Sequence, residues 1–242
     1  MSRRIVIAMM MLVMVPASCA FAVTVTDNFD TSFDYLPGNV PAGGIWTRVL
    51  NPGAGGGLNM MPPVDPVPKF DANNSTPGSL TMSTFNVGFG AGGASSAPAL
   101  VREVDADQLR EVRLRVSAQT AGQWSTAGIL VRAPGPIDAV GANDNFLGFY
   151  SYRPGPDNVP FAGGNSANLR NIVNGGGGQG DVNVSPLTDA DVEYLRLVHL
   201  GTGDFQVFTS SDGTNWVRRH ETINIVNAGL ATGTLEVGLT GG

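Results

Sequence analysis

The chain has very little cysteine or lysine, and it lacks long apolar runs. Cys19 is the single cysteine and lies near the N-terminus. The part expected to fold therefore has no disulfide, and its stability must come from a packed core or a bound metal. Beyond residue 22 no apolar run reaches the roughly 20 residues that span a bilayer. We therefore expect no insertion into a membrane.

The charge balance bears on the class of partner. The sequence has 14 basic and 20 acidic residues, and its formal net charge is −6. Nucleic-acid binding draws on clustered lysine and arginine side chains. Adhesion to anionic lipid has the same requirement. The sequence therefore predicts that the partner is neither a nucleic acid nor an anionic membrane surface.

Residues 1–22 have the features of a signal peptide. Arg3-Arg4 is a basic start, Ile5–Val15 is an apolar run too short to span a bilayer, and Ala20-Phe21-Ala22 is a small-residue cleavage site. We expect cleavage before Val23. Lipidation of Cys19 is the alternative, but Pro16 stands where a lipidation signal has an aliphatic residue. The protein is predicted to be exported, to the extracellular space, the cell surface or the periplasm, and the composition is typical of a bacterial protein.

Alternation is the main structural signal in the sequence. Residues 194–199 and 205–208 alternate between apolar and polar side chains, which is typical of half-buried strands. Residues 201–204 and 212–215 are rich in Gly and Asn, which tolerate the positive φ of tight hairpin turns. No segment keeps a 3.6-residue period beyond one turn. With 33 glycines and 16 prolines, the chain is predicted to be all-β.

Other segments extend the same interpretation. Strands are expected at residues 23–29, 45–50, 80–85, 99–104, 109–118, 127–133, 145–153, 167–173 and 235–239. Residues 51–79 are expected to form a long loop. Many short strands with regularly spaced turns favour a β-sandwich, so residues 23–242 are predicted to be one sandwich domain.

Several stretches resemble one superfamily: AGILVRA at 127–133, EYLRLVHLGTGDFQVFTSSDGTNW at 193–216 and LEVGLTGG at 235–242. They are similar to concanavalin A-like lectin/glucanase domains, and most of all to bacterial DUF1349-related and laminin G-like modules. The opening TDNFD…WTRV at 26–49 is similar to the start of such domains. The resemblance implies a two-sheet antiparallel jelly-roll β-sandwich that binds carbohydrate or serves as an accessory or structural module. Because such domains usually end with one further strand, which pairs with the N-terminal one, we expect this chain to lack its last strand.

Two carboxylates are candidates for catalysis. Glu103 and Asp105 alternate on an expected strand and so share a face, as the nucleophile and the general acid of a glycosidase do. Members of the superfamily that hydrolyse glucans carry a glutamate as the third acidic residue of this motif, whereas here Asp107 and Gln108 stand at the corresponding positions. The simpler interpretation is a charged strand end in solvent.

Aromatic side chains are the expected binding apparatus, because sugars stack their C–H faces on aromatic rings. Tyr150 and Tyr152 share a strand face by the period of two. If the sheet order follows the superfamily, Trp124, Arg132 and Phe161 lie nearby. The alternative is that these aromatic residues fill the core.

Two further patterns have structural or metal-binding interpretations. Residues 210–216, SSDGTNW, resemble an Asp-box hairpin, whose aspartate accepts hydrogen bonds from turn amides and whose tryptophan packs under the hairpin. Oxygen ligands for calcium could come from acidic residues in loops, namely Asp27, Asp30, Asp34, Asp138 and Asp144. The alternative for these is a simple solubilising role. No other cofactor is expected.

The sequence thus predicts an exported, non-catalytic, lectin-like module for extracellular or cell-surface glycan. The alternatives are a structural or adhesion domain without a small ligand, and a glycoside hydrolase that uses Glu103 and Asp105.

Overall fold

The chain folds into antiparallel sheets, and the described residues contain no helix. The computed structural model describes residues 24–51, 69–83, 98–116, 125–134, 146–153, 166–172, 182–184, 193–201, 203–220, 222–224, 230 and 232–241. The expected signal peptide lies outside these ranges. Within them, no helix is long and apolar enough to cross a membrane.

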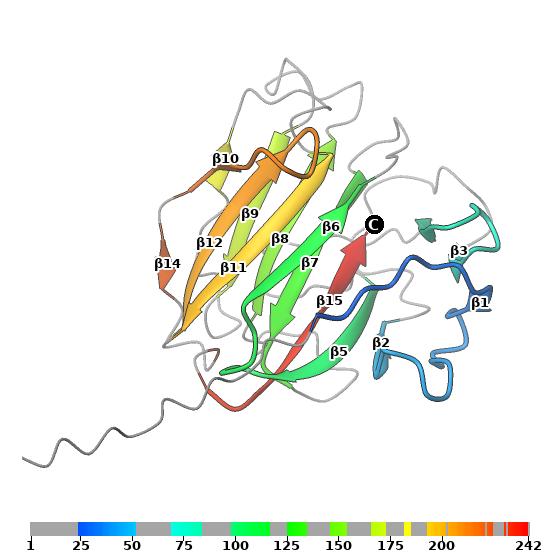
Figure 1. Cartoon of the computed structure of the whole chain (residues 1–242). Helices are drawn as coiled ribbons and strands as arrows, with labels where there is room; N and C mark the ends of the chain where they lie inside the picture. The colour runs from blue at the N-terminus through cyan, green and yellow to red at the C-terminus, as the bar shows by residue number, and fades with distance from the viewer. Residues whose placement is uncertain are drawn as a thin grey trace, which may run out of the picture.

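The largest sheet has seven strands and forms one layer of the molecule (Figure 1). In spatial order they are β10 (Val182–Val184), β9 (Ser166–Ile172), β8 (Phe146–Arg153), β7 (Ser125–Arg132), β15 (Thr234–Gly241), β5 (Ala99–Asp105) and β2 (Arg48–Leu50). β15 is paired on both sides, with β7 and β5.

A five-stranded sheet lies in front of the seven-stranded one in Figure 1. It contains β13 (Val217–Arg218), β12 (Asp204–Ser210), β11 (Tyr194–Gly201), β6 (Glu111–Arg115) and the short β14 (Ile223–Asn224), which pairs with β12. The predicted hairpin is present, because β11 and β12 pair from Tyr194 opposite Ser210 to Gly201 opposite Asp204. Gly201 and Gly203 have positive φ values of 92° and 79° at this turn.

The two sheets enclose one apolar core, which makes the fold a sandwich. Every second residue of β11 and β12 points inward and meets the inward residues of β7, β8 and β15, including Leu195, Leu197, Phe205, Val207, Ile129, Val131, Leu147, Phe149, Leu235 and Val237. Each such side chain contributes about 1.5–3 kcal/mol when it leaves water. The alternation read from the sequence therefore has its physical cause in this core.

A third sheet of β1 (Phe33–Asp34), β3 (Lys69–Ala72) and β4 (Leu80–Ser83) covers the remaining part of the inner face. Its Tyr35 and Phe70 pack against Leu100 of β5. Burial and the nearby charge of Asp27 raise the pKa of the Tyr35 hydroxyl to about 12.

The predicted fold class, an all-β antiparallel β-sandwich, is confirmed by these pairings. Two details of the prediction are wrong. Residues 24–29 form no strand, since Asp27 turns the chain by accepting a hydrogen bond from the Phe29 amide at 2.7 Å. The expected loop at 51–79 contains β3.

Candidate functional site

The predicted glycan platform lies on the outer face of the seven-stranded sheet. Tyr150 and Arg132 point to this face, but their exposed fractions are only 5% and 2%. Tyr152 has a backbone position on the same face, opposite Thr126, and its side chain lies outside the described part of the structure, as do Trp124 and Phe161. The structure therefore places both residues on this face in a buried environment, but four positions apart along the strand pair, since Arg132 is opposite Phe146 and Tyr150 is opposite Gly128.

Arg132 is held there by a buried ionic network. Its Nε lies 2.6 Å from Oε2 of Glu236, and Nη2 of Arg48 lies 2.5 Å from Oε1 of the same carboxylate. Glu236 is fully buried. Within the described residues, neither of its oxygens makes a hydrogen bond of good geometry, so charge attraction holds the network together. A carboxylate between two guanidinium groups serves stability here.

Two glycines on the same face lie very close to atoms of the neighbouring strands. A Cβ on Gly128 would collide with Cβ of Tyr150, and a Cβ on Gly238 would collide with the carbonyl oxygen of Leu100. Both glycines lie at outward positions of β7 and β15. The face is thus built from large side chains set between glycines, with no room for added atoms at these two positions.

Glu103 and Asp105 both lie exposed near the end of β5. Glu103 is directly opposite Glu236, and Asp105 is opposite Thr234. A glycosidase needs a general acid whose pKa is raised, and enzymes achieve this by burying the carboxyl in an apolar pocket. The exposed position of these two carboxylates gives no support to catalysis.

The candidate calcium ligands are not gathered in the described structure. Oδ1 of Asp27 accepts the Phe29 amide, and Oδ2 accepts Nε1 of Trp46 at 2.6 Å. Asp30 and Asp34 are exposed, and Asp34 accepts the amide of Leu36. Asp138 and Asp144 lie outside the described residues, within which no three metal-ligating side chains come together.

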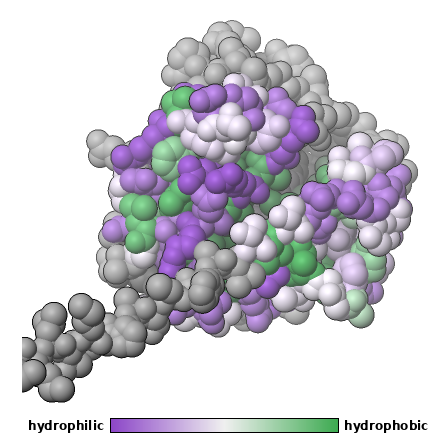
Figure 2. Space-filling view, in the orientation of Figure 1, coloured by the Kyte–Doolittle hydropathy of each residue, from purple (hydrophilic) through white to green (hydrophobic). Residues whose placement is uncertain are grey.

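A different face carries exposed aromatic and basic side chains: the outer face of the five-stranded sheet. Alternation points one set of side chains away from the core, namely Glu111, Arg113 and Arg115 on β6, Tyr194 and Arg196 on β11, and Phe208 on β12. Trp216 follows the hairpin after β12. We call these seven residues the arginine–tryptophan face. Figure 2 shows hydrophilic side chains gathered over this sheet.

Strand register places the face in rows. Arg113 is opposite Arg196, which is opposite Phe208, which in turn is opposite Arg218. Directly opposed residues share a face and are close enough to interact. The central row therefore brings three arginines and one aromatic ring into a line across four strands.

Arginine planes stack on the aromatic rings of this face. The Arg113 and Arg196 guanidinium carbons each lie 5.6 Å from the Trp216 ring centroid. Arg196 also lies 5.4 Å from Phe208, and Arg115 lies 5.5 Å from Tyr194. Such contacts fix long side chains in one orientation, so the donors of these arginines are arranged before any ligand arrives.

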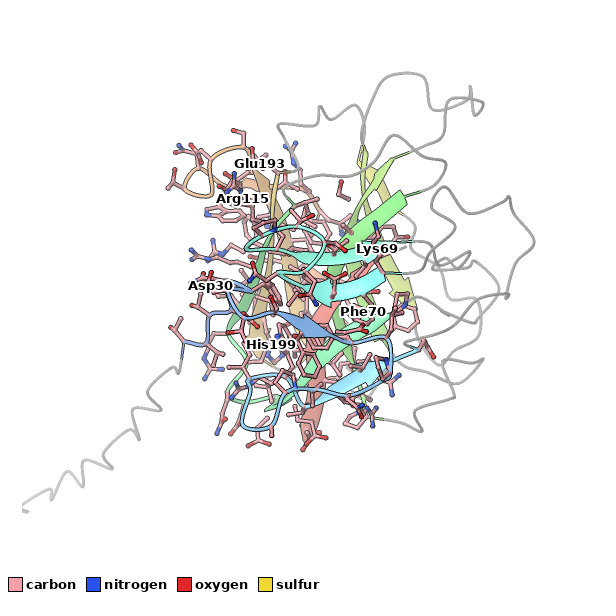
Figure 3. All side chains as sticks on the ribbon, turned by 90° about the vertical axis from the view of Figure 1, so that its right-hand side faces the viewer. Asp30, Lys69, Phe70, Arg115, Glu193 and His199 are labelled. Carbon is pink, nitrogen blue, oxygen red and sulfur yellow. The ribbon has the colours of Figure 1, made fainter. Side chains whose placement is uncertain are left out.

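Two glutamates pair with the arginines. Glu111 accepts hydrogen bonds from Arg196 and contacts Arg113, and Glu193 accepts from Arg115 at 2.9 Å. Figure 3 shows Arg115 and Glu193 side by side, on the side of the five-stranded sheet that faces away from the other sheets. The exposed fractions of Arg113 and Arg115 are 54% and 62%, so this network is open to solvent.

The hairpin at 210–216 positions Trp216. Asp212 Oδ1 accepts the amides of Thr214 and Asn215 at 2.8 and 2.7 Å, and Oδ2 accepts Nδ2 of Asn215. These hydrogen bonds hold the pKa of Asp212 well below its usual range. Gly213 has a φ of 72°, and a Cβ there would lie 3.1 Å from the Tyr194 ring. The expected role of the aspartate in the turn is thus observed, while the tryptophan is half-buried and its ring lies beneath the guanidinium groups of Arg113 and Arg196.

This arrangement is suited to recognising a polar ligand with flat apolar surfaces. Aromatic rings offer stacking surfaces and arginines offer several donors each. The sequence analysis did not select these residues. The alternation of Glu111, Arg113 and Arg115 was a signal, but their pairing partners on β11 lie about 80 positions further along the chain.

Comparisons with known proteins add little. No protein-family model matches the chain, and no curated protein matches it. Among solved structures, a lectin from Bauhinia forficata in complex with GalNAc matches with a TM-score of 0.35 and 10% identity, over 60% of this chain and 72% of that one. A likeness this weak carries no functional inference. The β-sandwich rests on the strand pairing described above, and the closer resemblance to DUF1349-related and laminin G-like domains stays a prediction.

Proposed function

We propose that this chain is an exported, non-catalytic carbohydrate-binding module that recognises extracellular or cell-surface glycan through the arginine–tryptophan face. The observation that carries the proposal is the stacking of Arg113 and Arg196 on the half-buried Trp216. Ordered donors beside an aromatic ring meet the two needs of sugar recognition, which are hydrogen bonds to hydroxyl groups and stacking against C–H faces.

Position on strands strengthens the proposal. Tyr194, Arg196 and Phe208 belong to the paired strands β11 and β12, whose opposite faces are anchored in the core. A ligand would therefore meet a surface that loses little conformational entropy on binding. By contrast, Tyr150 and Arg132 would have to leave a buried environment before they could contact a glycan.

Glycan-array binding of residues 23–242, with and without calcium, tests the proposal. Trp216→Ala should abolish most of the binding while the unfolding transition stays in place. Val217→Ala is the matched control, since Val217 is the next residue and is half exposed. Binding that survives Trp216→Ala but disappears when Tyr150 and Tyr152 are both changed to alanine would assign the ligand to the other sheet.

A structural or adhesion role without a small ligand is the second candidate. The burial of Tyr150 favours it, because an aromatic residue that fills the interior cannot also be a platform. A folded protein that binds nothing on the array would support this role. A structural calcium ion stays a prediction for the loop that contains Asp138 and Asp144.

A further inference from the structure

One carboxylate already occupies the central pair of arginines on the arginine–tryptophan face. Glu111 Oε2 lies 2.8 Å from Nε and 2.6 Å from Nη2 of Arg196, and its Oε1 lies 2.7 Å from Nη2 of Arg113. Each carboxylate oxygen is thus taken by a different guanidinium group. The two arginines, which are direct neighbours on β6 and β11, are spaced to hold one planar carboxylate between them.

The central row has more positive than negative charge. Arg113, Arg196 and Arg218 lie in it, and the register places no acidic residue there. Among the described residues, Arg218 donates to the carbonyl of His220 and to the hydroxyl of Thr222. Within the described part of the sheet, Glu111 lies one position beyond the row on the same strand face and reaches its two arginines, while Asp204 lies toward one end of the sheet and Glu193 and Asp212 toward the other.

The arginine pair suits a carboxylate, because the carboxylate of Glu111 already fits between the two guanidinium groups. The guanidinium fork matches the two coplanar oxygens of a carboxylate, and such pairs are stronger than neutral hydrogen bonds. The row crosses four strands, which is about 14 Å at the usual strand spacing. A polymer of sugar rings that carry carboxylates could contact the arginine pair, the Trp216 ring and Arg218 at once.

We propose that the ligand of this face is a carboxylated glycan of the uronic-acid type, and that Glu111 acts as an internal competitor for the arginines that bind its carboxylates. This inference rests on the proposed function and names its ligand class. On binding, a ligand carboxylate takes the place of the Glu111 carboxylate between Arg113 and Arg196. A ligand must therefore bind this face more favourably than the Glu111 carboxylate does. Neutral sugars and isolated carboxylates do not displace Glu111, whereas a polymer with repeated carboxylates does.

The test compares an oligogalacturonate with a neutral galacto-oligosaccharide of the same length, by calorimetry on residues 23–242. We expect at least about tenfold tighter binding of the oligogalacturonate. Arg113→Gln should weaken it by about tenfold, and Glu111→Gln should tighten it by about three- to tenfold because the competitor is lost. The affinity should fall as sodium chloride rises from about 0.05 M to about 0.5 M.

Matched controls come from the turn before β6, where Asp107 and Arg110 are exposed and lie off the face. Asp107→Asn and Arg110→Gln make the same charge changes and should leave oligogalacturonate binding unchanged. Chemical denaturation of every variant verifies folding. Arg113→Gln removes one ion pair with Glu111, and Glu111→Gln removes the pairs with Arg113 and Arg196, all of which are at least partly exposed to solvent.

Each outcome decides the question. Equal affinity for neutral and carboxylated oligomers, with loss of both in Trp216→Ala, would overturn this inference while leaving the proposed function intact. Unchanged or weaker oligogalacturonate binding by Glu111→Gln would overturn the competitor role. Tighter binding of a sulfated oligosaccharide or of polyglutamate would overturn the assignment of the ligand. Binding of no oligosaccharide by the folded protein would overturn the proposed function itself.

Discussion

Two sheet faces of this protein place the same residue types in opposite environments. The outer face of the seven-stranded sheet sets Glu236 between Arg48 and Arg132. The outer face of the five-stranded sheet sets Glu111 between Arg113 and Arg196, whose guanidinium groups lie over the Trp216 ring. The difference is solvent: Arg132 is 2% exposed and Arg113 is 54% exposed.

Solvent decides what each network can do. A buried ion pair is costly to form and more costly to break, because removal of one partner leaves an uncompensated charge. An exposed pair contributes little to stability, since water and salt screen it, and it can exchange partners. The buried network therefore fixes the fold, and the exposed one is available for binding.

The largest expected effect follows from breaking the buried network. Glu236→Gln removes the buried negative charge that pairs with the buried Arg132 and with Arg48, whose side chain is a quarter exposed. We expect the free energy of unfolding to fall by about 3–5 kcal/mol, as measured by chemical denaturation. A loss below about 1 kcal/mol, in the range of exposed pairs, would remove the contrast between the two faces.

A second test adds a single carbon to the buried face. In Gly238→Ala the new Cβ would meet the carbonyl oxygen of Leu100 and lie 2.8 Å from Cα of Val101. Because backbone must move, we expect a loss of about 3 kcal/mol, the upper part of the range for overpacking. Gly128→Ala, which would collide with Tyr150, should behave alike. Thermal unfolding at an unchanged midpoint in both variants would contradict the close approach.

The third test loosens the exposed face without touching the core. Asp212 has a lowered pKa because amides of the hairpin hydrogen-bond to its carboxylate. The ionised Asp212 therefore stabilises the hairpin fully at a pH above the ordinary aspartate pKa of about 4. This stabilisation is lost only as the pH falls through the lower pKa that Asp212 has in the folded protein. Asp212→Ala should remove it at neutral pH, shift the NMR signal of the Trp216 indole N–H and weaken glycan binding severalfold.

The control for that variant is Ser211→Ala, which changes an exposed neighbour in the same hairpin. It should leave both the indole signal and the affinity as in the wild type. If Asp212→Ala left the Trp216 signal unmoved from pH 3 to pH 7, the hairpin would not be what positions the ring.

The smallest effect is expected for an exposed ion pair. A double-mutant cycle with Arg115→Gln and Glu193→Gln should give a coupling free energy below about 1 kcal/mol, because the Arg115 side chain is mostly exposed to water and the Glu193 side chain is partly exposed. High salt should reduce this coupling further. A coupling as large as that of the buried network would mean that exposure does not separate the two faces.

Local features of the fold could be predicted from the sequence. The alternation in residues 194–199 and 205–208, with glycines between, predicted β11, β12 and their hairpin, because each inward side chain has a core to fill. The segment 23–29 misled the prediction. Within the described structure, residues 24–29 pair with no strand. The Asp27 carboxylate instead accepts hydrogen bonds from the Phe29 amide and the Trp46 indole.

The candidate sites were harder to predict because they depend on pairing between distant segments. Tyr150 and Tyr152 share a strand face as expected, yet nothing in the sequence shows that Tyr150 is buried. Glu236 was overlooked, although a lone acidic residue in the apolar run Leu235–Leu239 is a recognisable sign of a buried ion pair. The arginine row exists only because β6 pairs with β11, and no local pattern encodes that pairing.

The position of β15 has a consequence for how the molecule assembles. β15 follows all the other described strands in the chain, yet it lies between β7 and β5. Until residues 234–241 are available, the seven-stranded sheet consists of two separate parts, and the open edges of β5 and β7 can pair with other chains. Pairings this distant in sequence form slowly. Self-association should therefore compete with folding most strongly in the interval before this last insertion, and shielding of those two edges should raise the yield of native protein.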